Sequence, residues 1–109
     1  MDELLCRKVT KVLLPAIRAS VAEVLEKNYN FTQQETAKKL GVVQVAVSKY
    51  TNRRYSKEVM QMKEYIDAKG LNAGIIKSIV EGISTNEINR RIDILCNENS
   101  LLKMLASVD

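Results

Sequence analysis

Apolar residues recur every three or four positions through most of this chain, which is the spacing of an amphipathic α-helix. In the N-terminal part, the apolar residues at this spacing are Ile17, Val21, Val24 and Leu25. Pro15 interrupts the pattern, and proline is tolerated in the first turn of a helix but breaks a helix interior. The pattern therefore predicts a short helix near 3–13 and a main helix over about 15–28, with a single kinked helix as the alternative.

A helix with a clear start and end is predicted over about 33–40. Thr32 followed by Glu35 forms a capping box, in which each side chain satisfies a backbone N–H at the start of the helix. Leu40 and Gly41 end the helix, because glycine adopts left-handed backbone angles without a side-chain clash.

A second short helix is predicted from Val43 or Gln44 to about Asn52. Valine cannot accept a backbone hydrogen bond, so either Gln44 or water caps this helix, or the helix starts less sharply than usual. Crossed helices need small or apolar residues where they meet each other and the core. Residues of this kind at suitable spacing are Ala37, Gly41, Val47 and Tyr50. The two helices therefore have the pattern of a helix-turn-helix.

The rest of the chain is also predicted to be helical after a loop at 53–55. Ser56 can cap a helix that closes at Lys69 and Gly70, and Ser84 with Glu87 makes a second capping box. Apolar residues then continue at helical spacing, with a last short helix near the end: Ile75, Ile76, Ile79, Val80, Ile83, Ile88, Ile92, Ile94, Leu95, Leu101, Leu102 and Leu105.

Composition agrees with an all-α protein. The chain has 109 residues with one Pro and four Gly, and it lacks the Asn-Gly and Asp-Gly pairs that mark β-hairpins. We expect a helix-turn-helix domain over 1–70 and a helical tail over 71–109.

The tail has more large apolar residues than a unit of about 40 residues can bury by itself. The surplus must pack on the preceding domain or on another chain, and we favour a symmetric homodimer. The residues predicted to form its interface are Ile76, Ile79, Ile83, Ile88, Ile92, Leu95 and Leu102.

Positive charge is concentrated around the helix-turn-helix. Residues 31–63 hold seven cations and two acids, a net charge of +5, whereas the whole chain carries +4. This distribution suits a phosphate-binding surface, although a lysine-rich solvated face is the alternative.

Other function classes have little support in the sequence. No segment approaches the ~18 consecutive apolar residues of a membrane span, and the acidic N-terminus lacks the layout of a signal peptide, so a cytoplasmic location is expected. The chain has no His, no nucleophile motif and no Gly-rich phosphate loop, which argues against an enzyme, a metal site or a cofactor. We interpret Cys6 and Cys96 as buried or half-buried thiols, and a disulfide between them is the alternative.

A helix-turn-helix inserts the N-terminal end of its second helix into the major groove of double-stranded DNA. The residues predicted to read bases face away from the core: Gln44, Val45, Ser48 and Lys49. A glutamine amide matches the N6 and N7 edge of adenine, and valine suits a thymine methyl. The residues predicted to contact phosphates flank this helix or begin the preceding one: Thr32, Gln33, Asn52, Arg53, Arg54 and Tyr55.

Three runs together resemble small archaeal transcription regulators with a lambda-repressor-like (XRE-type) helix-turn-helix: 14–18 (LPAIR), 33–42 (QQETAKKLGV) and 44–50 (QVAVSKY). The resemblance covers about residues 4–56. It implies a helical DNA-binding domain, operator binding as a dimer, and repression or activation of nearby genes. Such proteins often have Thr or Ser where this chain has Val43.

A protein-interaction module remains the alternative function. In that case the apolar tail would bind a partner in the manner of an antitoxin or an adaptor, and contact with DNA would be secondary.

Overall fold

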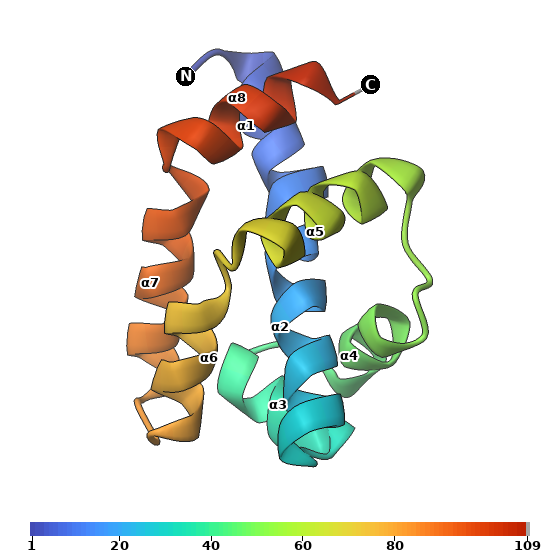
Figure 1. The fold of residues 1–109 in the computed structure, drawn as a ribbon, viewed down its shortest axis with the longest axis vertical. Coiled ribbons are helices and arrows are strands. Elements are labelled where there is room, and N and C mark those ends of the chain that lie inside the picture. Colours follow the sequence, from blue (N-terminus) through green and yellow to red (C-terminus); the bar gives the residue numbers. More distant parts are fainter. Residues whose placement is uncertain (109) are drawn as a thin grey trace.

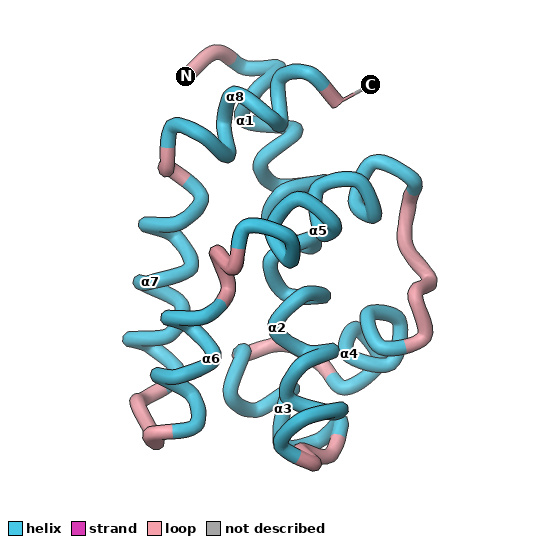
Figure 2. The backbone as a smooth tube through the Cα atoms, in the orientation of Figure 1, coloured by secondary structure: helices cyan, strands magenta, loops and turns pink. Residues whose placement is uncertain are grey.

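The protein is all-helical over residues 1–108, the part that the computed structural model describes (Figure 1). Short loops join the helices, and the described residues contain no strand (Figure 2). The helices are α1 (Glu3–Lys8), α2 (Leu14–Tyr29), α3 (Gln33–Leu40), α4 (Gln44–Thr51), α5 (Lys57–Lys69), α6 (Ala73–Val80), α7 (Thr85–Cys96) and α8 (Asn99–Ser107), and a π-helical segment, η1 (Val9–Leu13), joins α1 to α2. The all-α fold class is therefore as predicted.

The N-terminal stretch is continuous, whereas the sequence favoured a break before Pro15. Helix α1 passes through η1 directly into α2, with Pro15 in the first turn of α2. A π-helical turn is wider than an α-helical one, which gives the proline ring room beside the preceding carbonyl groups. The alternative of one distorted helix is thus nearer to the structure, and the π-helical segment is the distortion.

Helix α2 lies at the centre of the molecule, and the other helices surround it (Figure 1). Its side chains Ile17, Val21 and Leu25 are fully buried. Leu40 of α3, Val47 of α4 and Ile66 of α5 belong to the same hydrophobic core.

The tail is part of this core. Ile79 of α6, with Ile88 and Ile92 of α7, is almost completely buried in the same cluster as the side chains of α2. The tail therefore packs on the preceding helices, and its core is continuous with theirs.

This placement corrects four of the residues predicted for a dimer interface, those that are buried. Ile76, Ile79, Ile88 and Ile92 are buried inside the chain, while Ile83, Leu95 and Leu102 are half-buried and pack against the core. The prediction underestimated how much apolar surface the first five helices offer to the tail. Asp109, the last residue of the predicted tail, lies outside the described residues.

Helix α8 runs across the N-terminal helix, so the two ends of the chain lie at the same end of the molecule (Figure 1). The Lys8 ammonium donates to the carbonyl of Val108 at 2.6 Å. No helix among the described residues is long and apolar enough to cross a membrane.

Candidate nucleic-acid interface

Helices α3 and α4 form a helix-turn-helix whose first helix has the predicted caps. Thr32 Oγ1 accepts from the Glu35 N–H at 3.0 Å, and the Glu35 carboxylate accepts from the Thr32 N–H at 2.9 Å. The pKa of Glu35 lies below its usual value because the Thr32 backbone N–H, and then the Thr32 side chain, form hydrogen bonds with its carboxylate. Gly41 ends the helix with a φ of +69°, in the left-handed region.

Helix α4 is held by its inner face. Val47 is fully buried and Tyr50 is half-buried against the core, as the spacing predicted. Ala37 is also buried, which lets α3 approach closely. At the cap position Val43 has extended backbone angles and makes no side-chain hydrogen bond, so the first turn of α4 has free N–H groups.

The outer face of α4 carries the residues predicted to read bases. Gln44, Val45 and Lys49 are exposed, and Ser48 is half-buried. Val43 is 71% exposed and Val45 66%, so two neighbouring valines face solvent at the start of this helix. Only Val45 was predicted to contact DNA, but the exposure of Val43 also signals a surface for apolar contact.

The side chain of Asn52 is held at the end of α4 by hydrogen bonds to Ser48. Its amide donates to the Ser48 carbonyl at 2.9 Å and contacts Ser48 Oγ at 3.3 Å. This exposed side chain still offers its amide oxygen, although that group accepts hydrogen bonds and does not suit a phosphate. The predicted phosphate contact therefore fits Asn52 poorly.

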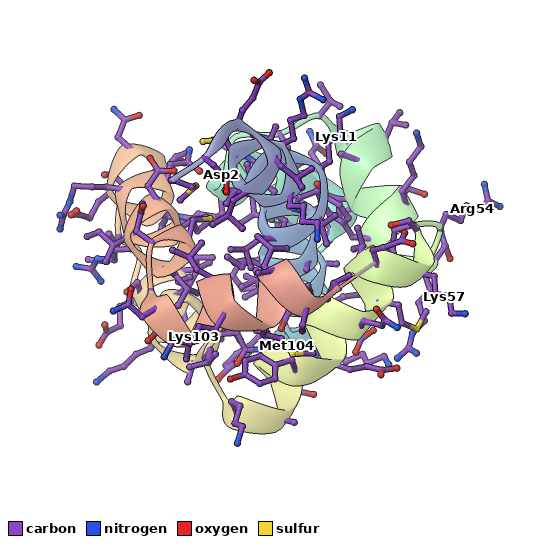
Figure 3. All side chains as sticks on the ribbon, turned by 90° about the horizontal axis from the view of Figure 1, so that it is seen from above. Asp2, Lys11, Arg54, Lys57, Lys103 and Met104 are labelled. Carbon is purple, nitrogen blue, oxygen red and sulfur yellow. The ribbon has the colours of Figure 1, made fainter. Side chains whose placement is uncertain are left out.

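The three residues of the loop after α4 that were predicted to bind phosphate, Arg53, Arg54 and Tyr55, have different surroundings. Arg53 has a φ of +55°, and its guanidinium lies 3.3 Å from Glu23 Oε2. Arg54 is exposed and has no ion pair among the described residues. Arg54 and Lys57 extend outward from the same edge of the molecule (Figure 3). Lys57 begins α5 and was not among the predicted contacts, although its place after the basic loop is visible in the sequence.

Tyr55 has a packing role, which corrects its prediction as a phosphate contact. Its ring packs against the core, and its hydroxyl is buried with no hydrogen-bond partner among the described residues. Burial raises the pKa of this hydroxyl above its usual value. A hydroxyl in this position cannot reach a phosphate without moving the ring.

Lys63 is also removed from the basic surface. Its ammonium is buried and lies 3.1 Å from Glu23 Oε1 and 2.8 Å from Asp67 Oδ2. Burial lowers the pKa of Lys63, but the hydrogen bonds to Asp67 and Glu23 outweigh it, and the net shift is upward. The i, i+4 spacing of Lys63 and Asp67 was the one sequence signal for this pair. The exposed cations of the basic stretch are thus Lys38, Lys49, Arg53, Arg54 and Lys57.

The start of α3 offers the remaining predicted contacts. Thr32 is exposed, and its hydroxyl oxygen accepts the capping hydrogen bond from the Glu35 N–H. Gln33 is half-buried in the first turn, where free backbone N–H groups attract anions.

The tail supports the turn of the helix-turn-helix. Thr85 Oγ1 donates to the carbonyl of Lys38 at 2.9 Å, so the first residue of α7 adds a second hydrogen bond to a carbonyl at the end of α3 that also accepts from the Gly41 N–H at 3.4 Å. The second predicted capping box is only half formed. Ser84 caps α7 by accepting from the Glu87 N–H at 3.3 Å, but the Glu87 carboxylate lies against Arg90, at 2.6 Å from its Nε.

Within the described residues, no three His, Cys, Asp or Glu side chains are grouped so that they could hold a metal ion. Both cysteines are free; Cys96 is buried as expected, whereas Cys6 is exposed, unlike either interpretation from sequence. Comparisons with protein-family models, curated proteins and solved structures found no match to this chain. The interface therefore has to be interpreted from its own geometry and charge.

Proposed function

We propose that this protein is a sequence-specific, double-stranded-DNA-binding transcription regulator of the lambda-repressor-like type. The observation that carries the proposal is the outer face of α4, where Gln44, Val45 and Lys49 are exposed on a helix whose opposite face is buried. A helix held in this way presents fixed side chains to the major groove, which is wide enough to admit it.

Sequence would be read at the N-terminal end of α4. The Gln44 amide donates and accepts at once, as the N6 and N7 edge of adenine requires, and Val45 supplies apolar contact for a thymine methyl. Val43, the exposed residue at the cap of α4, offers a second apolar side chain at this end of the helix. Lys49, one turn further along, lies where it can meet a base edge or a phosphate.

Affinity would come from the groups around this helix. Arg54 and Lys57, which follow α4 in the chain, supply exposed positive charge, and Thr32 with the first turn of α3, which precedes α4, supplies hydrogen-bond donors. Arg53 reaches the DNA only by sharing or leaving its contact with Glu23. Neutralising phosphates releases counterions, so the affinity should fall steeply with salt, by roughly 0.9 in log K per log unit of salt for each phosphate contacted.

The test is binding to DNA chosen by selection from random duplexes, followed by affinity measurements on the selected site. Arg54→Glu and Lys57→Glu are expected to weaken binding to all duplexes and to reduce the salt slope. Lys103→Glu is the matched control, because Lys103 is an exposed lysine on α8, distant from Arg54 and Lys57 (Figure 3).

Gln44→Ala tests base reading separately from affinity for phosphate. The wild-type protein should bind the selected site more tightly than a site in which the contacted adenine is replaced. Gln44→Ala should reduce this ratio of affinities by about ten- to a hundredfold, the discrimination of a bidentate contact. No enrichment of any sequence, or unchanged discrimination in Gln44→Ala, would count against the proposal as stated.

The alternative of a protein-interaction module draws less support than it did from sequence. It relied on an apolar tail open to a partner, whereas most of the large side chains of the tail are buried in the chain's own core.

A further inference from the structure

A shallow apolar groove runs between α6 and α7. It has a volume of about 290 Å³, and its apolar lining comes from Leu71, Gly74, Ile75, Ile94 and Leu95. Ile94 stands at its edge with 57% of its surface exposed, next to a second hollow formed by the outer face of α7. An isoleucine exposed to this extent beside an apolar groove is a surface suited to protein contact.

Gly74 lines this groove, and nothing inside the chain requires a glycine at this position. It lies in α6, and apart from its chain neighbours and the backbone of its own helix no atom lies within 4 Å of the place where a Cβ would stand; its φ is not positive. Glycine destabilises a helix relative to alanine, and neither backbone angle nor crowding requires it here. Its effect is to leave room for a side chain from outside the chain.

The charges around the groove have a definite order along the chain. The cations Arg90 and Arg91 come before Ile94, and the acid Glu98 follows it. Asp93 lies beside Ile94 and makes the set neutral. A surface with cations at one end and an acid at the other complements a copy of itself turned by a two-fold rotation.

We propose that a second copy of this chain docks on this groove, with the two α7 helices antiparallel and crossing at Ile94. Arg90 of α7 and Glu98, the residue that caps α8, both line the hollow beside Ile94. A two-fold rotation about Ile94 therefore brings Arg90 toward Glu98 of the partner subunit, and the reverse contact forms by symmetry. The Ile94 side chain of each copy enters the groove beside Gly74 in the other.

The Arg90 guanidinium and the Glu98 carboxylate each have atoms left to form this contact. Arg90 uses its Nε for Glu87, which leaves both terminal nitrogens of the guanidinium. Glu98 caps α8 through Oε2, which accepts from the Leu101 N–H and from Ser100 Oγ, and its Oε1 makes no hydrogen bond among the described residues. Neither side chain has to give up its existing partner.

Helices α6 and α7, whose residues line the groove, lie on the opposite side of the molecule from the loop that joins α4 to α5 (Figure 1). Docking there leaves Arg54 and Lys57 exposed. Self-association of the chain does not require DNA. The inference therefore rests on the proposed function only where it assigns this dimer to a DNA-binding regulator.

Sedimentation equilibrium of the full chain tests the interface. The wild-type protein is expected to dimerise, and Ile94→Glu should raise the dimer dissociation constant about a hundredfold, as for a central interface residue. Val80→Glu is the matched control, because Val80 is an apolar residue of α6 that is 45% exposed and does not line the groove. A wild-type monomer, whose groove would then be left for a small ligand or another protein, would overturn the proposal, as would equal weakening by both variants.

Charge reversal tests the predicted orientation. Arg90→Glu and Glu98→Lys should each weaken the homodimer by placing like charges together. An equimolar mixture of the two variants should form a heterodimer, because each reversed group then meets its opposite. A mixture that stays as weakly associated as either variant alone would rule out the antiparallel arrangement.

A DNA measurement separates this proposal from the proposed function. Ile94→Glu should bind a single half-site as the wild type does, and should lose the cooperative binding to the full palindrome. A chain that dimerises through Ile94 and binds no DNA would overturn the proposed function alone. A chain that binds DNA and never dimerises would overturn only the docking surface.

Discussion

Val43 is the N-cap residue of α4, but its side chain makes no capping hydrogen bond. Its backbone has the angles of an N-cap residue, φ −76° and ψ 151°, and its exposed side chain cannot accept from the first N–H groups of α4. Val43→Thr places a hydroxyl oxygen at this position and removes little buried surface. We expect it to raise the free energy of unfolding by about 0.5–1 kcal/mol.

Chemical denaturation measures this difference, with Val45→Thr as the control. Val45 has a similar exposure but lies inside the first turn of α4, where a hydroxyl cannot cap the helix. If the two variants have the same stability, the missing cap is not what limits the start of α4.

The two thiols differ in their surroundings and should differ in reactivity. Cys6 is exposed on α1, whereas Cys96 is buried at the end of α7. Burial, assisted by Asp93, raises the pKa of Cys96 to about 11, so its thiol stays protonated near neutral pH. We expect one thiol to react rapidly with a disulfide reagent such as Ellman's reagent, and the second only on unfolding.

Cys6→Ser should abolish the rapid phase of this reaction and leave the slow one. A rapid reaction that survives in Cys6→Ser would mean that Cys96 is open to solvent in the folded state.

At the scale of helices, Gly41 and Gly70 have the same backbone role but different neighbours. Both end a helix with a positive φ, of +69° and +65°. A Cβ on Gly41 would lie 3.1 Å from Asn89 Nδ2 and 3.2 Å from Thr85 Cγ2, whereas a Cβ on Gly70 would meet nothing within 4 Å. Gly41 is thus needed both for the turn and for the approach of α7.

Alanine at the two positions separates backbone strain from crowding. Gly70→Ala should cost about 1 kcal/mol, the strain of a left-handed alanine. Gly41→Ala should cost more, because Thr85 or Asn89 must also move. Urea unfolding of both variants makes the comparison, and equal losses would show that α7 does not press on this turn.

Local signals made the helix boundaries predictable. The caps at Thr32 and Ser56 and the glycines that end α3 and α5 act on backbone groups within a few residues, so the sequence around them is sufficient. At Glu87 such local signals were not sufficient. Arg90 competes for the Glu87 carboxylate, so only half of the predicted capping box forms. The continuation of the first helix through Pro15 depended on a π-helical turn that has no clear sequence signal.

At the scale of the whole molecule, the single core is the main departure from the predicted organisation. Ile79, Ile88 and Ile92 share one cluster with the side chains of α2, so the boundary near Gly70 does not divide the core. Sequence showed that the tail was too apolar to stand alone, but not which surface it covers, because that depends on contacts between residues far apart in the chain. The same applies to the candidate site, where Lys63 and Tyr55 turned inward.

A truncated chain of residues 1–70 is therefore expected to fold poorly. Removing α6–α8 exposes the buried faces of α2 and α3, and small units have too little core to compensate. Circular dichroism should show a clear loss of helix per residue relative to the full chain, and the full chain should unfold in one cooperative transition. A stable, fully helical 1–70 would instead establish an independent N-terminal domain.

The contact between Lys8 and the carbonyl of Val108 has a consequence for connectivity. Because both ends of the chain lie together, on the far side of the molecule from α3, a short linker could join them without crossing the candidate DNA surface (Figure 1). New ends could open at the exposed turn of Glu81 and Gly82, between α6 and α7. Such a circular permutant would begin with α7 and keep every helix pair in place. The fold would then depend on which helices touch, rather than on the order in which they are made.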